Sequence, residues 1–191
     1  NNIKFYHTFS IDKELKKPMD REELIRSIME KSELKQIPRL DAGLAFSHFE
    51  RRQTSDEEKI RLTRELLHKV YGAFGSRKLL VLRDRAPEWI LKKHISTKER
   101  FPHYREVYKR VLGNFKGTVI DLGAGVNGFS LDFMPGQKYI GVEGIGQLVD
   151  LMNGYFKKKK LNAEAVHLSL FEIEKIKSVI EEQKGKKIVL L

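Results

Sequence analysis

The sequence contains no cysteine and no long uninterrupted run of apolar residues. The lack of cysteine excludes disulfide scaffolds, thiolate zinc sites, iron–sulfur clusters and cysteine nucleophiles. A membrane-crossing helix requires roughly 18 to 20 apolar residues, so we expect a cytoplasmic protein with no membrane partner. Five histidines show no metal-ligand spacing among themselves, and we predict no metal site; they are His7, His48, His68, His103 and His167.

Basic residues outnumber acidic ones, with 37 lysines and arginines against 26 aspartates and glutamates, for a net charge of +11. This excess indicates a polyanionic partner, because neutralising phosphates releases their bound counterions. The alternative interpretation is a solvated surface rich in lysine and glutamate, as in heat-adapted proteins. With 40% hydrophobic residues, the chain can form a packed core.

Residues 1–114 show helical periodicity and predict an all-helical N-terminal domain. Helices are predicted over 20–36, from Thr54, from Pro87 and from Ser96 or Thr97. A capping box, Asp20 with Glu23, opens the first. We interpret residues 39–53 as a linker. In the last of these helices five side chains are expected to face inward: Tyr104, Val107, Tyr108, Val111 and Leu112.

Residues 115–191 change to a pattern of strands alternating with helices. Strands are predicted over 118–122, 138–142, 165–168 and 187–191. Helical stretches at 147–160 and 171–183 separate the later strands, so we predict an α/β fold with a parallel sheet and right-handed crossovers. A final apolar strand would leave an unpaired edge. We therefore expect this sheet to be incomplete, the N-terminal half of a larger core.

A glycine-rich turn after the first strand carries the clearest chemical signal. Gly123, Gly125 and Gly128 have the spacing of a dinucleotide fingerprint, and Glu143 ends the next strand, where a carboxylate binds ribose hydroxyls. A nucleoside methyl donor would use the same Glu143. Asp121 would repel a pyrophosphate, whereas S-adenosylmethionine offers a cationic ammonium and sulfonium. The turn therefore favours S-adenosylmethionine, with a nicotinamide dinucleotide as the weaker alternative.

Two segments carry a family resemblance. The first is His94-Ile95-Ser96-Thr97-Lys98-Glu99-Arg100, followed by Tyr104 and Tyr108; the second is Asp121-Leu122-Gly123-Ala124-Gly125-Val126-Asn127. Over about residues 89–191 the sequence resembles the 16S ribosomal RNA guanine-nitrogen-7 methyltransferases of the aminoglycoside-resistance family. Those enzymes have an H-x-S-T-[KR]-E-R motif ahead of a D-[LIF]-[GA]-x-G-x-N-P motif.

The resemblance implies a Rossmann-like, S-adenosylmethionine-dependent methyltransferase core behind the helical N-terminal domain. It implies ribosomal RNA or the small ribosomal subunit as partner. Arg100 would bind the methionine carboxylate of the cofactor, and His94 with the Ser96-Thr97 pair would brace the pocket. No catalytic residue is assigned, because guanine nitrogen-7 is unprotonated and already nucleophilic. The implied cofactor-binding residues are His94, Arg100, Asp121, Gly123, Ala124, Gly125, Asn127, Glu143, Gly144, Ser169 and Leu170.

The N-terminal domain is then expected to dock on RNA. Clustered basic residues are the candidates for phosphate contacts; they are Arg51, Arg52, Arg77, Lys78, Arg83 and Arg85. A further basic block covers residues 157–160, where the lysines could equally complement a helix dipole.

The sequence departs from the family pattern at three places. Gly128 stands where the family has proline, which would loosen the turn. Ser169 stands where many such enzymes hold an aspartate against the adenine amino group. The family's residues beyond the fourth strand, which shape the target-base pocket, lie beyond this chain. Two alternatives therefore stay open: a non-catalytic RNA- or ribosome-binding module, and a methyltransferase acting on a small molecule or a protein.

Overall fold

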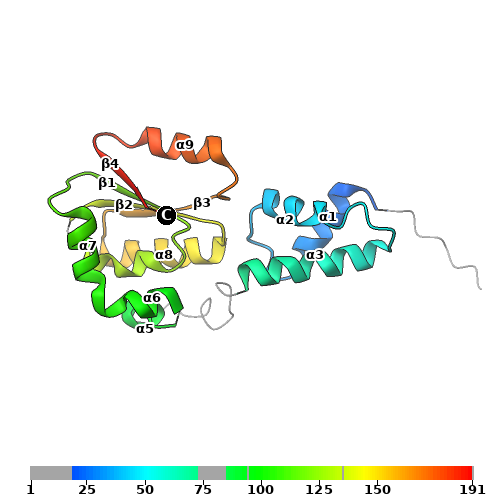
Figure 1. Cartoon of the computed structure of the whole chain (residues 1–191), viewed down its shortest axis with the longest axis horizontal. Helices are drawn as coiled ribbons and strands as arrows, with labels where there is room; N and C mark the ends of the chain where they lie inside the picture. Colours follow the sequence, from blue (N-terminus) through cyan, green and yellow to red (C-terminus); the bar gives the residue numbers. More distant parts are fainter. Residues whose placement is uncertain (1–18, 73–84, 94, 135, 191) are drawn as a thin grey trace, which may run out of the picture.

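The computed structural model of the chain describes residues 19–72, 85–93, 95–134 and 136–190 (Figure 1). Its centre is a four-stranded parallel sheet of order β3-β2-β1-β4. The strands are β1 (Thr118–Leu122), β2 (Lys138–Glu143), β3 (Ala163–His167) and β4 (Lys187–Leu190). Helix α8 (Gly146–Lys159) connects β2 to β3, and α9 (Ile173–Glu182) connects β3 to β4. The predicted α/β class is confirmed, with β3 starting two residues earlier than expected.

Helices cover both faces of the sheet. Figure 1 shows α9 on one face and α8 on the other, so the crossovers wind the chain around a doubly covered sheet. Three short helices pack on the α8 side, namely α5 (Pro87–Leu91), α6 (Ile95–Arg100) and α7 (Tyr104–Leu112). A 3₁₀ turn, η1 (Phe101–His103), joins α6 to α7. After the glycine-rich turn the chain forms a second 3₁₀ segment, η2 (Asn127–Phe133).

The remaining helices form a lobe of their own beside the sheet (Figure 1). These are α1 (Arg21–Met29), α2 (Arg39–Ser47) and α3 (Asp56–Tyr71). Their shared core includes Leu24, Ile28, Phe46 and Leu67. We call residues 19–72 the N-terminal lobe.

The predicted capping box of α1 is confirmed. The Asp20 carboxylate accepts from the Glu23 backbone N–H at 2.8 Å, and the Glu23 carboxylate accepts from the Asp20 N–H at 2.9 Å. The helix nevertheless ends at Met29 and not at residue 36. Residues 30–37 turn instead, and this turn brings Leu34 and Ile37 into the core of the lobe.

The linker predicted over 39–53 was wrong, because most of it is helix α2. Ala42, Ala45 and Phe46 of this helix are buried in the lobe. Two buried residues within the same helix, Asp41 and Gly43, break the simple apolar stripe that identifies an amphipathic helix. The periodicity was therefore too weak to predict it.

The inward face predicted for α7 is correct for its two tyrosines and for Leu112, which are all buried. Val107 and Val111, however, are 36% and 48% exposed. Residues 104, 108 and 112 recur every four positions and define the buried stripe. The two valines are each one position away, about 100° around the helix, and lie at its margin.

Side-chain packing divides the described chain between the N-terminal lobe and the sheet. Ile90, Leu91, Tyr104 and Tyr108 belong to the hydrophobic core of the sheet, so α5 and α7 pack with it. The domain boundary expected after residue 114 stays a prediction. None of the helices in the described ranges has the length and apolarity needed to cross a membrane.

Gly128 has a packing role in η2. A Cβ atom at this position would lie 2.8 Å from Met152 Sδ and 2.8 Å from Phe156 Cζ, both on α8. The lack of a side chain therefore lets η2 approach α8 closely and fixes the path of the chain after the turn. At this position the structure shows tight packing against α8.

Candidate ligand site at the carboxyl ends of the strands

Asp121 and Glu143 lie at the same edge of the sheet, at the carboxyl ends of β1 and β2. The two strands are parallel and adjacent, with Asp121 opposite Gly141 and Leu122 opposite Val142. Open α/β sheets bind their ligands at this edge. The strand order therefore brings together two carboxylates that are separated in sequence.

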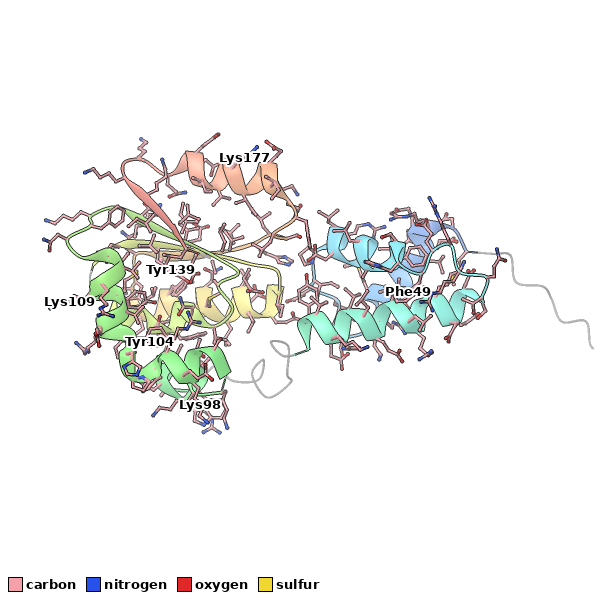
Figure 2. All side chains as sticks on the ribbon, viewed as in Figure 1. Phe49, Lys98, Tyr104, Lys109, Tyr139 and Lys177 are labelled. Carbon is pink, nitrogen blue, oxygen red and sulfur yellow. The ribbon has the colours of Figure 1, made fainter. Side chains whose placement is uncertain are left out.

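The Asp121 carboxylate is buried, with 7% of the residue exposed, and it is held by two donors. Its Oδ2 atom accepts from Asn127 Nδ2 at 2.8 Å and from the Tyr139 hydroxyl at 2.7 Å. The Tyr104 hydroxyl in turn donates to Asn127 Oδ1 at 3.0 Å. Figure 2 labels Tyr104 on α7 and Tyr139 on the sheet. This network ties α7, the glycine-rich turn, β1 and β2 together.

A second branch of the network extends along η2. The Ser130 hydroxyl donates to the Asn127 carbonyl at 2.6 Å and lies 2.5 Å from the Tyr108 hydroxyl. Burial raises the pKa of Tyr108, so its hydroxyl stays protonated and can donate. All of these polar groups are buried, and their hydrogen bonds offset the cost of removing them from water.

Burial also raises the pKa of the Asp121 carboxyl. The hydrogen bonds from Asn127 and Tyr139 oppose this shift, and so does the positive charge of Arg100. Both hydrogen bonds reach Oδ2, so neither of them occupies Oδ1. A nearby cation would therefore stabilise the charged form of the buried Asp121 carboxylate.

Glu143 fixes the backbone of the glycine-rich turn. Its Oε2 atom accepts from the Gly125 N–H at 2.8 Å, and its Oε1 atom accepts from the Ile145 N–H at 2.8 Å. Gly123 and Gly125 have φ values of +73° and +53°, in the left-handed region that favours glycine. Burial raises the pKa of Glu143, and the backbone N–H groups of Ile145, Gly125 and Gly144 oppose that shift.

Arg100 ends α6 with an exposed side chain, whose Nε atom donates to the Ser96 carbonyl at 3.0 Å. Its positive charge opposes the upward pKa shifts of Asp121 and Tyr104, so the guanidinium is near enough to act on both side chains. Thr97 is buried and donates to the Leu91 carbonyl at 2.5 Å, which ties α6 to the end of α5. His94 lies outside the described residues.

On the other side of Glu143, the segment after β3 is bound to the N-terminal lobe. Ser169 is fully buried; its hydroxyl donates to Asp41 Oδ1 and accepts from the Phe171 N–H at 3.0 Å. Leu170 Cδ1 would lie 3.6 Å from a Cβ atom on Gly123, so Leu170 borders the glycine-rich turn. Sequence reasoning missed Asp41, because its segment was interpreted as a linker.

The basic residues predicted to bind RNA are not all brought together. Arg51 and Arg52 are exposed after α2, with the Arg52 guanidinium 4.9 Å from the centre of the Phe49 ring, which Figure 2 labels on the N-terminal lobe. Arg85 lies by the core, 5.6 Å from the Trp89 ring. The other three candidates, Arg77, Lys78 and Arg83, lie outside the described residues.

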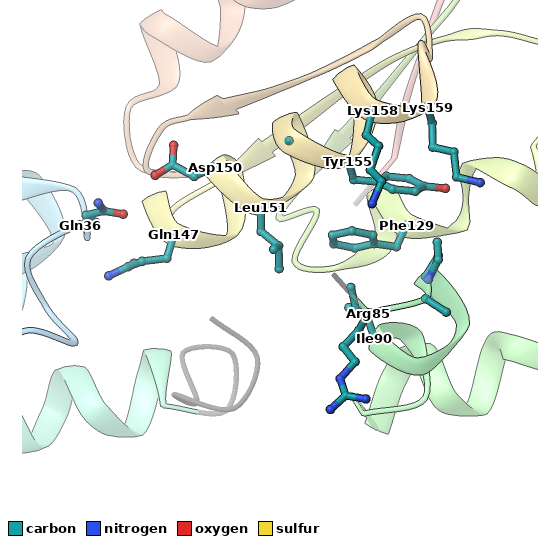
Figure 3. Close-up of a pocket in the computed structure, with 13 residues that line it drawn as sticks. Gln36, Arg85, Ile90, Phe129, Gln147, Asp150, Leu151, Tyr155, Lys158 and Lys159 are labelled. Carbon is teal, nitrogen blue, oxygen red and sulfur yellow. The ribbon is translucent and has the colours of Figure 1, made fainter. Parts of the chain in front are cut away.

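A groove of about 650 Å³ separates Arg85 from the basic end of α8. Figure 3 shows Lys158 and Lys159 on one side of it and Arg85 on the other. The polar, basic and aromatic residues that line the groove include Gln36, Arg85, Phe129, Tyr155, Lys158 and Lys159. Its walls combine aromatic rings with basic side chains, and Gln36 brings the N-terminal lobe to its rim.

The fold matches those of solved ribosomal RNA methylases. The 16S rRNA methylase RmtB aligns with a TM-score of 0.70 and 19% identity, over 81% of this chain and 67% of that one. An rRNA methylase from Escherichia coli aligns with a TM-score of 0.70 and 17% identity, over 80% of this chain and 65% of that one. The 16S rRNA methyltransferase RmtF, in complex with S-adenosyl-L-homocysteine, aligns with a TM-score of 0.65 and 24% identity, over 80% of this chain and 65% of that one.

This chain has the rRNA methyltransferase fold. The fold implied by the sequence resemblance is therefore confirmed. The chain spans about two thirds of the length of each of these three proteins. No protein-family model matches the sequence, and no curated protein matches it.

The raised pKa of Asp121 predicts how stability depends on pH. Because burial raises this pKa in the folded state above its ordinary value of 3.8, the folded state binds the proton more tightly than the unfolded chain does. The contribution of Asp121 to stability therefore falls as the pH rises above that value. Asp121→Asn carries no charge but can still accept from Tyr139. We expect the variant to gain stability relative to wild type as the pH rises from 3.8 through the raised pKa of Asp121.

Urea unfolding of both proteins at several pH values measures this difference. Glu143 is present in both proteins, so its own titration cancels in the comparison. A stability difference that does not change with pH, or that changes in the opposite direction, would contradict the assignment of a raised pKa to Asp121.

Proposed function

We propose that the chain is part of an S-adenosylmethionine-dependent methyltransferase that acts on RNA of the small ribosomal subunit. The observation that carries this proposal is the pair of buried carboxylates, Asp121 and Glu143, at adjacent strand ends. The fold shared with solved rRNA methylases supports it. So does RmtF, which was solved with the demethylated form of this cofactor.

The acceptors and charges at these strand ends fit an adenosine whose tail carries positive charge. The Glu143 oxygens accept from the Gly125 and Ile145 N–H groups, and a carboxylate has about four lone-pair positions, so acceptor capacity remains for a ribose hydroxyl. Gly123 and Gly125, both at positive φ, carry no side chain at two positions of the turn where the nucleoside would lie. A dinucleotide fits less well, because its pyrophosphate would meet the Asp121 carboxylate.

The opposite end of the cofactor would lie toward Arg100. A guanidinium pairs with a carboxylate through two parallel hydrogen bonds, which suits the methionine carboxylate. The Asp121 carboxylate would attract the ammonium group of the same tail. The two residues would therefore recognise opposite charges of one amino acid and fix its direction.

When bound, S-adenosylmethionine supplies a methyl group on a sulfonium. The chain's own residues would then orient this group toward the acceptor, because alignment accounts for much of the rate of a direct displacement. The guanine acceptor rests on the resemblance of the 94–100 and 121–127 segments. A neutral ring nitrogen needs no general base, and we assign none in the described site.

Binding to RNA would use the excess of positive charge. Arg51 and Arg52 would contact phosphates from the N-terminal lobe. Arg85, Lys158 and Lys159 line the groove of Figure 3, and their charges would contact the phosphates of a nucleic acid strand.

The role of Arg100 can be tested by calorimetric titration with S-adenosylmethionine. Arg100→Ala removes the bidentate partner of the methionine carboxylate, and we expect affinity to fall roughly 10- to 100-fold, as for the loss of a charged hydrogen bond. Lys98→Ala is the matched control, because Lys98 is an exposed cation on the same helix. The control should bind like wild type. Equal affinities of the two variants would refute a specific role for Arg100.

The RNA contacts predict a salt effect. Binding of small-subunit ribosomal RNA should weaken as salt rises, and the Arg51→Gln/Arg52→Gln variant should reduce the slope of log K against log[salt] by about 1 to 2. Filter binding at several salt concentrations measures this slope. Arg61→Gln is the control, because Arg61 is already neutralised by Glu58 at 2.7 Å and by Glu65. A control with the same loss of slope would show that only net charge matters.

A further inference from the structure

Asp41 is a buried acidic residue of the N-terminal lobe that contacts the segment after β3. Only 8% of the residue is exposed. One carboxylate oxygen accepts from the Tyr71 hydroxyl of the same lobe, and the other accepts from the Ser169 hydroxyl, 128 positions along the chain. A buried carboxylate between two neutral hydroxyls has no salt-bridge partner among these contacts, and burying such a charge is costly.

Neighbouring contacts show that the lobe is seated beside this carboxylate. The Gly146 N–H donates to the Gln36 carbonyl at 2.8 Å. Pro38 and Tyr71 approach Gly144, where a Cβ atom would lie 3.8 Å from the proline Cδ and 3.6 Å from the tyrosine ring. The lobe therefore contacts the loops that follow both β2 and β3, on either side of Asp41.

The order of the strands fixes the direction of a nucleoside in the proposed site. Asp121 lies at the carboxyl end of β1, Glu143 ends β2 in the middle, and Ser169 follows β3 on the far side; the charge of Arg100 acts on Asp121, at the β1 end of this row. With the amino acid tail toward Arg100 and the ribose at Glu143, the base must extend toward β3. The base edge would then lie next to Ser169, Leu170 and Asp41.

The residues at this end suit an adenine. Leu170 is 41% exposed and borders Gly123, so it offers an apolar contact for the flat ring. Ser169 is fully buried, and its hydroxyl already donates to Asp41 and accepts from the Phe171 N–H, so it retains a single lone pair. A carboxylate has about four lone-pair positions, so the two bonds to Asp41 leave acceptor positions free.

We infer that the N-terminal lobe completes the base end of the cofactor site, with Asp41 accepting from the adenine amino group. This inference rests on the proposed function and adds a binding residue from a different part of the chain. It also means that seating of the lobe and binding of the cofactor reinforce each other, because such coupling is reciprocal. Cofactor binding would thereby stabilise the position of the lobe that is proposed to contact RNA.

The test is a comparison of two ligands by calorimetry. S-adenosylhomocysteine carries an amino donor on its base, whereas S-inosylhomocysteine carries a carbonyl acceptor at the same position. Wild type should prefer the adenosine form by at least about tenfold, since a site built to accept a hydrogen bond rejects an analogue that lacks the donor. Asp41→Asn presents an amide N–H₂, so it should lose or reverse this preference.

Two further variants separate recognition from folding. Asp56→Asn makes the same change at another carboxylate of the lobe, which accepts from the Met19 N–H at 3.1 Å; it should keep the wild-type preference. Tyr71→Phe removes one bond to Asp41 but leaves the carboxylate; it should weaken binding of both ligands without changing their ratio.

The outcomes distinguish the two proposals. If Asp41→Asn binds both ligands with the wild-type ratio, or weakens both equally, Asp41 is only structural and this inference is wrong. If wild type binds neither ligand, the proposed function fails and this inference fails with it. A loss of preference confined to Asp41→Asn supports both. Protection of α2 amides from hydrogen exchange on adding S-adenosylhomocysteine would support the coupling of lobe and cofactor, and unchanged exchange there would contradict it.

Discussion

One buried carboxylate, Asp121, fixes the geometry on which the candidate site depends. Its Oδ2 atom receives hydrogen bonds from Asn127 and from Tyr139, and Asn127 is held in turn by Tyr104. These bonds join the end of β1 to the glycine-rich turn, to β2 and to α7. Because an unpaired buried charge is expensive, a rearrangement of the turn that removes the Asn127 donor would destabilise this carboxylate. The same burial that demands donors also favours a cationic ligand.

Glu143 performs a complementary task at the neighbouring strand end. By accepting from the N–H groups of Gly125 and Ile145, it holds the backbone on either side of β2 in place. The site is therefore assembled before a ligand arrives, so little ordering entropy remains to oppose binding. The exposed Arg100 and the segment around Ser169 complete the two ends of this rigid centre. The segment around Ser169 contacts the N-terminal lobe through Asp41.

Local patterns predicted the parts of the structure that local forces determine. The strand at 118–122, the capping box of α1 and the two strand-end carboxylates all follow from short segments read in isolation. Helix α2 was missed, because Asp41 and Gly43 are buried for reasons of tertiary contact and weaken its apolar stripe. The bond between Asp41 and Ser169 has no local signal, since it joins residues 128 positions apart. The tight approach of Gly128 to α8 likewise emerges only when the elements pack.

The central claim is that this edge of the sheet holds a nucleoside with a cationic tail and not a dinucleotide. Titration of the chain with S-adenosylmethionine and, separately, with NAD measures this choice directly. The account predicts saturable binding of S-adenosylmethionine and no detectable binding of NAD, because a pyrophosphate would lie against the Asp121 carboxylate. Binding of NAD without binding of S-adenosylmethionine would contradict it and would identify the glycine-rich turn as a dinucleotide fingerprint.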